Sequence, residues 1–227
     1  ILLLGALAGA LGAQASGSAI IGLMTGITIG AAVGLIFGVI STTLRGSQLI
    51  SGVGINLFAL GFVALMLTVM GAPGFHSVAR DVQVPLIHLG VGSLSPLVIV
   101  TVILAVAVWW LLRRTQLGLW IRAVGENPAA ADVAGLRVNA LRLGAAIAAG
   151  AFAGLAGAYL SVDWFGAVTK EITAGRGFIA LAIVVFSGLN PLLALLGGFI
   201  FGFFDGLATW VATYPGVKDI IPWQFVA

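Results

Sequence analysis

The chain of 227 residues contains no cysteine, two histidines and two lysines. Without cysteine it has no disulfide framework and no thiolate metal ligand. His76 and His88 are not accompanied by an HExxH, GxSxG or paired-carboxylate motif, so we expect no metal or catalytic site of its own. Lys170 and Lys218 do not stand in a GxxxxGKS/T loop, so the chain is not a P-loop ATPase by itself. If nucleotide powers this protein, another subunit must bind it.

Charge is equally scarce. Asp, Glu, Lys and Arg make up 7% of the residues, against about a quarter in a typical soluble domain. Hydrophobic residues make up 61%, and the mean hydropathy is +1.20. Because alternating strand patterns are absent, helices are the only plausible way to span a bilayer. The net charge of +3 suits loops beside anionic lipid better than a nucleic-acid surface.

We therefore expect an all-α, polytopic transmembrane helical bundle of about seven to eight helices, forming one domain over 1–227. A spanning helix needs roughly 20 apolar residues, and 178–188 is too short, so it is either a half-helix or a span extended by its flanks. Both ends of the chain lie within apolar runs, so we expect a piece of a longer protein that lacks part of a helix at each end. The predicted helices cover 1–13, 19–43, 49–70, 95–112, 144–162 and 191–213.

Charge also predicts the orientation of the spans. Alternating them places six arginines on one side and four basic residues on the other, so the side with six is expected to be cytoplasmic. The loop at 113–143 is then cytoplasmic, and the loop at 71–94 faces outward. The six arginines are Arg45, Arg113, Arg114, Arg122, Arg137 and Arg142, and the four opposite residues are Arg80, Lys170, Arg176 and Lys218.

Glycines recur every four residues in the span at 19–43. This spacing lays them along one helix face, where a second helix is expected to pack almost backbone to backbone. Such contacts serve ordinary bundle packing, or they let helices slide during transport. The glycines are Gly22, Gly26, Gly30, Gly34 and Gly38, and shorter versions of the pattern are Gly198, Gly202 and Gly206, and Gly150, Gly154 and Ala158.

Two polar residues within the spans are candidates for lining a solute path. Asp205 follows Gly202 by three residues, so it shares the glycine-bearing face and is expected to point into the bundle. It is either a packing residue or part of a path, because intramembrane carboxylates often mark such paths. Asn56 lies in SGVGINLFALG, where three glycines are expected to weaken the helix and to free backbone groups toward a cavity. Path lining and helix-to-helix hydrogen bonding are both open for Asn56.

The loop at 113–143 contains a short helix signal in RAVGENPAAADVAGLRV. Asn127 suits the cap, Pro128 the first helical position and Gly135 the residue after the end, which predicts a helix of about two turns. Glu126 lies beside the positive, N-terminal end of this helix, and Arg137 lies just beyond its negative, C-terminal end. Both charges are therefore favourable to the helix dipole. The small, mildly apolar residues between them suit a socket on a soluble partner, while a simple connector between two spans is the other interpretation.

At these residues the chain resembles a known family. LGLWIRAVGENPAAADVAGLRVNALRLGAAIAAGAFAGLAGAYLSV is similar to the cytoplasmic loop and following helix of bacterial ABC importer permeases of the ribose and branched-chain amino acid superfamily. Within it, the simple-sugar and nucleoside permeases are most similar. SGVGINLFALG and GRGFIALAIVVFSGLNPLLALLGGFIFGFFDGL extend the resemblance. The pattern that carries it is Gly125, Glu126, Asn127, Ala130, Ala131 and Gly135.

The resemblance implies a permease subunit in the bacterial inner membrane. Its implied partners are ATP-binding cassette subunits that bind ATP and Mg²⁺, a second permease subunit, an extracytoplasmic solute-binding protein and membrane lipid. The candidates for the translocation path stay Asn56 and Asp205, on the polar positions described above and not on the resemblance. The alternative is a secondary transporter or channel without an ATPase, in which Asp205 is an ion or proton site. The implied coupling helix comprises Gly125, Glu126, Asn127, Pro128, Ala130, Ala131, Asp132 and Gly135.

Overall fold

The structure is a computed structural model of the chain. It describes residues 1–44, 46–71, 75–77, 87–89, 92–169, 172–173 and 175–213. Four of the ten basic residues used for the orientation, Arg45, Arg80, Lys170 and Lys218, lie outside the described residues, as does most of the loop at 71–94.

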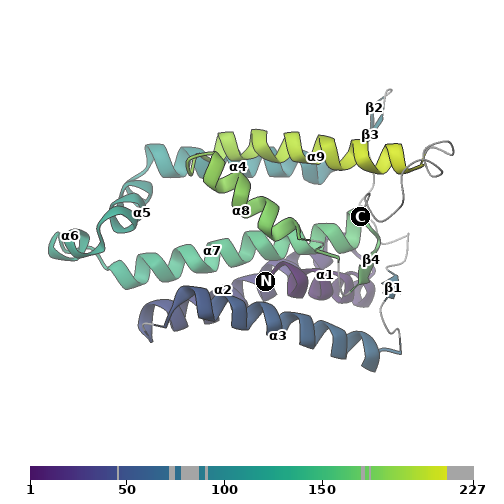
Figure 1. The fold of residues 1–227 in the computed structure, drawn as a ribbon, viewed down its shortest axis with the longest axis horizontal. Coiled ribbons are helices and arrows are strands. Elements are labelled where there is room, and N and C mark those ends of the chain that lie inside the picture. The colour runs from purple at the N-terminus through teal and green to yellow at the C-terminus, as the bar shows by residue number, and fades with distance from the viewer. Residues whose placement is uncertain are drawn as a thin grey trace. The chain divides into compact units, whose positions relative to one another are not determined.

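The described chain is a set of apolar helices, as predicted from its composition (Figure 1). Five helical segments in the described residues are long and apolar enough to cross a membrane. Together with two shorter apolar helices they give the seven expected. These are α1 (Leu2–Ser16), α2 (Ala19–Gly38), α3 (Gln48–Val69), α4 (Pro96–Arg114), α7 (Val138–Tyr159), α8 (Arg176–Phe186) and α9 (Pro191–Thr213).

The remaining elements are short. Helices α2 and α7 each continue into a five-residue π turn, η1 (Val39–Thr43) and η3 (Leu160–Trp164). Strand β1 (Phe75–Ser77) pairs antiparallel with β4 (Ala167–Thr169), and β2 (Ile87–Leu89) pairs with β3 (Gly92–Leu94). Two further helices, α5 (Gln116–Glu126) and α6 (Pro128–Val133), occupy the predicted cytoplasmic loop.

Most predicted spans are confirmed, and two expectations are wrong. Helix α3 runs unbroken through Gly52, Gly54 and Gly61, so its backbone groups stay bonded within the helix. Helix α7 starts at Val138, six residues before the predicted start at 144, because Asn139 and Arg142 interrupt the apolar run without ending the helix. The segment predicted at 178–188 is the 11-residue helix α8. It ends in a turn that contains Gly188 (φ 58°) and Leu189 (φ 61°).

The described contacts divide the chain into two compact units. Unit 1 comprises 1–101 and 110–174, and unit 2 comprises 102–109 and 175–227. Helix α4 therefore contributes its two ends to unit 1 and its middle to unit 2. In unit 2, α8 packs on α9 through close contact between Ile183 and Gly197.

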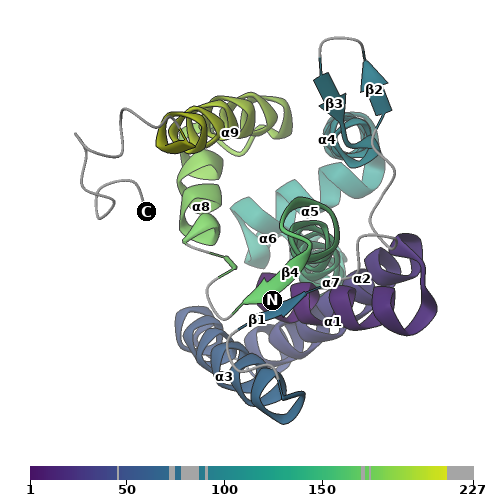
Figure 2. The ribbon, with the colours of Figure 1, turned by 90° about the vertical axis from the view of Figure 1, so that its right-hand side faces the viewer.

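The centre of unit 1 is the packing of α1, α2 and α7, which lie side by side in Figures 1 and 2. The glycine face predicted for the span at 19–43 is buried here. A Cβ built on Gly30 would lie 2.7 Å from the Cα of Gly154, and one on Gly34 would lie 3.0 Å from the Cα of Gly150. The two predicted glycine patterns therefore face each other, so α2 and the antiparallel α7 pack backbone to backbone.

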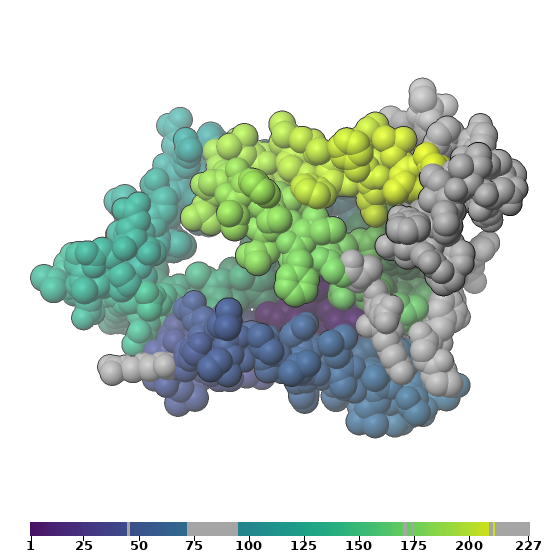
Figure 3. Space-filling view, in the orientation of Figure 1, coloured from purple at the N-terminus to yellow at the C-terminus, as the bar shows by residue number. Residues whose placement is uncertain are grey.

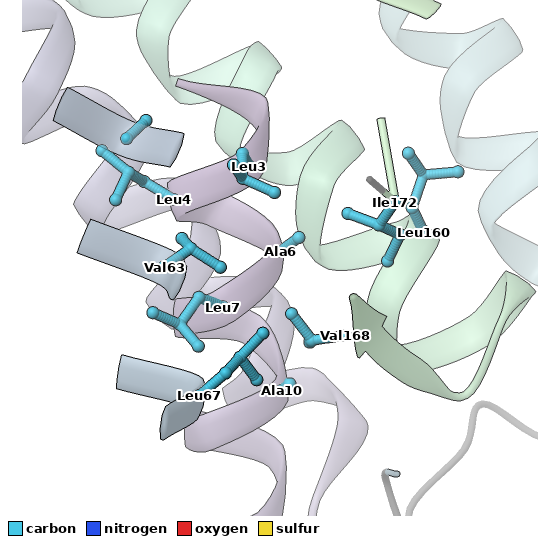
Figure 4. Packing of buried hydrophobic residues seen from close by; sticks show 11 residues of the cluster. Leu3, Leu4, Ala6, Leu7, Ala10, Val63, Leu67, Leu160, Val168 and Ile172 are labelled. Carbon is cyan, nitrogen blue, oxygen red and sulfur yellow. The ribbon is translucent and has the colours of Figure 1, made fainter. Parts of the chain in front are cut away.

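Helix α1 packs on the same pair of helices. A Cβ on Gly5 would lie 2.6 Å from the Cα of Gly154, and the Thr25 hydroxyl of α2 donates to the Ala8 carbonyl of α1 at 3.0 Å. On its other side α1 buries leucines against α3, η3 and β4 (Figure 4). This apolar cluster includes Leu3, Leu4, Ala6, Leu7 and Ala10 of α1, Ala59, Val63 and Leu67 of α3, and Leu160, Val168 and Ile172.

The glycine contact generates a stability prediction. Gly30→Ala should lower the free energy of unfolding by about 1–3 kcal/mol, since the new Cβ overlaps backbone atoms of α7 that cannot move singly. Thermal unfolding of the purified protein in detergent measures it. Gly61→Ala in α3 is the matched control: its Cβ meets no atom within 4 Å, and alanine favours a helix by about 0.5–1 kcal/mol over glycine. If Gly30→Ala is as stable as Gly61→Ala, the close helix pair is wrong.

Candidate functional site: the α5–α6 segment

The segment that joins α4 to α7 in unit 1 is largely helical. Helix α5 begins at the Thr115 cap, whose hydroxyl accepts from the Gly118 N–H at 3.2 Å and donates to the Leu111 carbonyl at 2.6 Å. A Cβ on Gly118 would lie 2.5 Å from the Cα of Leu112, so α5 folds back tightly against the end of α4. Val124 is only 3% exposed and faces the unit. The short helix α5 is thus held at its start and along one side.

A single residue ends α5 and begins α6. The Asn127 N–H donates to the Ala123 carbonyl at 3.0 Å, and its side-chain Oδ1 accepts from the Ala130 N–H at 3.0 Å. Asn127 is extended, with φ −142° and ψ 93°, because Pro128 disfavours helical geometry in the residue before it. Pro128 then occupies the first position of α6, where the missing N–H is not needed. The predicted cap and start are confirmed.

The end of α6 is also fixed. Gly135 adopts a left-handed conformation with φ 82°, its N–H donates to the Asp132 carbonyl at 2.9 Å, and the Leu136 N–H donates to the Ala131 carbonyl at 3.0 Å. These two bonds form a Schellman motif, which favours glycine at this position. The helix has six residues, slightly less than the two turns predicted.

The two faces of α6 differ in their exposure to solvent. Ala131 is 5% exposed and packs within unit 1, whereas Val133 is 91% exposed. Ala130, Asp132, Glu126 and Gly125 are also exposed. Figure 3 shows the segment, in teal, projecting at the end of unit 1. The outer face of α6 therefore contains Ala130 and Val133, and Ala131 lies on the inner face.

The two candidate path residues lie on other helices. Asn56 is exposed on α3. Asp205 on α9 accepts a hydrogen bond from Arg176 Nη2 at the start of α8, at 3.2 Å, an ion pair that the sequence did not predict. The side chains of Arg176 and Asp205 are 30% and 55% exposed. The charged pair thus lies at the surface of unit 2, and the expectation that Asp205 points into the bundle stays a prediction.

The three α9 glycines that recur every four residues have no packed neighbour in the described chain. Cβ atoms built on Gly198, Gly202 and Gly206 meet no described atom within 4 Å. The glycine pattern of α9 thus differs from that of α2, although the spacing in sequence is the same. A repeat of small residues therefore predicts a helix face that permits close packing, but it does not predict which element packs there.

Comparison with known proteins identifies the family. The family described as "Branched-chain amino acid transport system / permease component" matches residues 1–223. This chain belongs to that permease family. The nucleoside ABC transporter permease of Lactococcus lactis is 30% identical over 82% of this chain and 62% of its own length.

Two further relatives have similar printed functions. A putative glucose ABC transporter permease of Haloferax volcanii is 34% identical over 91% of this chain and 66% of its own length. A guanosine ABC transporter permease of Bacillus subtilis is 33% identical over 82% of this chain and 61% of its own length. The chain thus spans slightly less than two thirds of these relatives. No solved structure matches it significantly.

Within this permease, sequence reasoning missed α5 and the exposure of Val133. The segment 116–126 has buried positions at Gly118 and Val124 and exposed arginine and glutamate, an amphipathic pattern that indicates a helix too short to span a membrane. Val133 is the last residue of α6, and the direction of its side chain depends on how α6 packs on its neighbours.

The cap of α6 generates a prediction. Asn127→Ala removes the acceptor for the Ala130 N–H and should destabilise α6 locally by about 1 kcal/mol, so amide hydrogen exchange in 128–135 should rise about five-fold. Asn127→Asp keeps an acceptor oxygen at the same place and is the control, with exchange close to that of the parent protein. Equal exchange in both variants would show that the cap does not hold the helix.

Proposed function

We propose that this chain is the permease subunit of an ATP-driven ABC importer for nucleosides or simple sugars. Membership of the permease family and the printed functions of the relatives support it. The apolar helices supply the path through the membrane. ATP and Mg²⁺ are bound by a partner subunit, and a second permease subunit and an extracytoplasmic solute-binding protein complete the importer. The membrane is the bacterial inner membrane, with the α5–α6 segment on the cytoplasmic side.

The single observation that carries the coupling role is the exposure of Val133 at the end of a helix fixed at both ends. An isolated valine at a protein surface is ordinary. Here it stands at the tip of a capped, projecting helix that is too short and too poor in large apolar residues to anchor in lipid. A rigid knob of this kind fits a socket on the ATPase subunit. Motion of the socket would then pass through α6 to the first turn of α7.

This docking predicts that Val133→Lys releases the ATPase subunit. Lysine is at least as good a helix former as valine, and its charge is favourable at a helix C-terminus, so α6 should stay folded. Placing that charge in an apolar socket should weaken ATPase binding at least tenfold. We expect normal membrane insertion, loss of ATP-driven uptake and loss of the ATPase on purification.

The control is Val133→Leu, which keeps an apolar side chain of similar size and should retain both binding and uptake. If Val133→Lys binds the ATPase and transports solute as the parent protein does, α6 is a connector and not a coupling helix. The solute is tested separately, by screening nucleosides and sugars for binding to the importer's own solute-binding protein. Binding of neither class there would overturn the proposed solute.

Asn56 and Asp205 remain proposals for the translocation path. A charged pair at a surface of a membrane protein is costly against lipid, which favours a watery path or a protein neighbour for Asp205 and Arg176. The alternative, a transporter that works without an ATPase and binds an ion at Asp205, is less favoured, because the guanidinium of Arg176 already balances that carboxylate.

A path role predicts that Asp205→Asn is milder than Asp205→Leu, since asparagine can still hydrogen bond with Arg176 whereas leucine leaves the guanidinium without this partner. Uptake in proteoliposomes, normalised to folded protein, measures it with and without ATP. Uptake by the permease alone, driven by an ion gradient and abolished in both variants, would favour the alternative. If the two variants show equal ATP-driven uptake, Asp205 does not line the path.

A further inference from the structure

Helix α5 has an apolar face that the protein covers only in part. Four large apolar residues follow the spacing i, i+3, i+4 and i+7, which places them on one side of the helix: Leu117, Trp120, Ile121 and Val124. Val124 is 3% exposed, whereas Trp120 is 38% and Leu117 is 51% exposed. The face is therefore covered at the end of α5 and uncovered at its start, where α5 meets α4.

The start of α5 lies at the depth where α4 leaves the membrane. Helix α4 has 19 residues, and at about 1.5 Å per residue such a helix is about as long as the hydrocarbon core of a bilayer is thick. Its last two residues are Arg113 and Arg114. Thr115 is extended, and a Cβ on Gly118 would lie 2.5 Å from the Cα of Leu112, so the chain turns sharply after α4 (Figure 1). The first turn of α5 is thus held level with the two arginines.

Three arginines gather at this place without a carboxylate partner. Arg113 and Arg114 are exposed at the end of α4, and Arg122 is exposed on α5. Arg122 Nε donates to the Gly118 carbonyl at 3.4 Å, which draws its guanidinium back toward the end of α4. None of the three forms a salt bridge to another residue that the structure describes. The acidic residue of the segment 113–126 is Glu126, at the opposite end of α5.

Two exposed tryptophans accompany these charges. Trp110 precedes Arg114 by four residues, so both lie on one side of α4, and Trp110 is 57% exposed. Trp120 lies on the uncovered part of α5. Tryptophan is enriched at the boundary between acyl chains and headgroups, and arginine reaches the phosphates from there. We call residues 110–122 the α4–α5 junction.

We propose that the α4–α5 junction binds an anionic phospholipid, with the headgroup phosphate on the arginines and the acyl chains along Trp110, Leu117 and Trp120. Arginine binds phosphate through paired N–H groups, and each basic side chain near a membrane surface strengthens binding of anionic lipid. The proposal rests on α4 crossing the membrane. It does not depend on the solute or on the coupling role of α6.

The position of Trp110 favours a lipid over a soluble partner. Trp110 lies one turn before Arg114, on the membrane side of the arginines. A soluble protein can reach the arginines from the cytoplasm, but it cannot contact Trp110 without entering the bilayer. Free phosphate matches the arginines and leaves the apolar face of α5 uncovered. A phospholipid matches both the charges and the apolar surface.

Native mass spectrometry of the purified permease, titrated with phosphatidylglycerol or phosphatidylcholine, measures the binding. Phosphatidylglycerol should bind more tightly, and inorganic phosphate should not displace it. Arg114→Gln and Arg122→Gln should each lower the affinity for phosphatidylglycerol about fivefold and leave that for phosphatidylcholine unchanged. Arg137→Gln removes the same charge from an exposed position just before α7, outside the junction, and is the control, with the affinity of the parent protein.

A second measurement locates the acyl chains. In nanodiscs, phosphatidylglycerol brominated in the upper part of its chains should quench the fluorescence that Trp120 contributes, obtained as the difference between the parent protein and Trp120→Phe. Arg114→Gln should reduce this quenching. Quenching of equal strength by brominated phosphatidylcholine would show that Trp120 meets bulk lipid without selecting a headgroup, which overturns the proposal.

The other contrary outcomes are equally specific. The proposal is wrong if the two junction variants bind phosphatidylglycerol as the parent protein does, or if Arg137→Gln loses as much affinity as they do. It is also wrong if Trp120 is not quenched by lipid but is shielded when an ATPase subunit binds. Val133→Lys should bind the lipid normally, so release of the ATPase by that variant leaves this proposal standing, and failure of the lipid site leaves the coupling role standing.

Discussion

The backbone-to-backbone contact between α2 and α7 is the constraint on which unit 1 depends. Gly30 and Gly34 meet Gly154 and Gly150 so closely that no side chain larger than a hydrogen atom fits. Helices in a membrane gain little from the hydrophobic effect when they associate, so close van der Waals contact has to hold them together. Because α7 is fixed in this way, the proposed coupling role of α6 requires only that α6 act on α7, which would carry the motion into its membrane-spanning part.

The sequence predicted those parts whose cause is local. Asn127, Pro128 and Gly135 specify the start and end of α6 through backbone geometry that involves only their neighbours, and the structure has this geometry. The glycine repeat at 19–43 predicted a face for close packing, which α7 fills. Lengths of apolar runs predicted the long helices to within a few residues, apart from the early start of α7.

The parts that the sequence did not predict depend on contacts between distant elements. The pair of Arg176 with Asp205 joins residues 29 apart, and no local pattern indicates it. The same holds for the burial of Ala131 beside the exposure of Val133, because that difference arises from how α6 packs on α5 and α7. The face of α9 with its glycines resembles that of α2 in sequence but has no described neighbour, since small residues permit packing without specifying a partner.

The central claim is that the tip of α6 contacts an ATPase subunit in the cytoplasm, and cross-linking tests it most directly. The chain has no cysteine, so Val133→Cys gives a single reactive thiol. In membranes that contain the whole importer, a short thiol-to-amine cross-linker should join this position to the ATPase, whereas Leu57→Cys, which is exposed but lies within α3, should give no product. In intact cells, a membrane-impermeant maleimide should not label Val133→Cys. Labelling from outside, without any cross-link to the ATPase, would contradict the account.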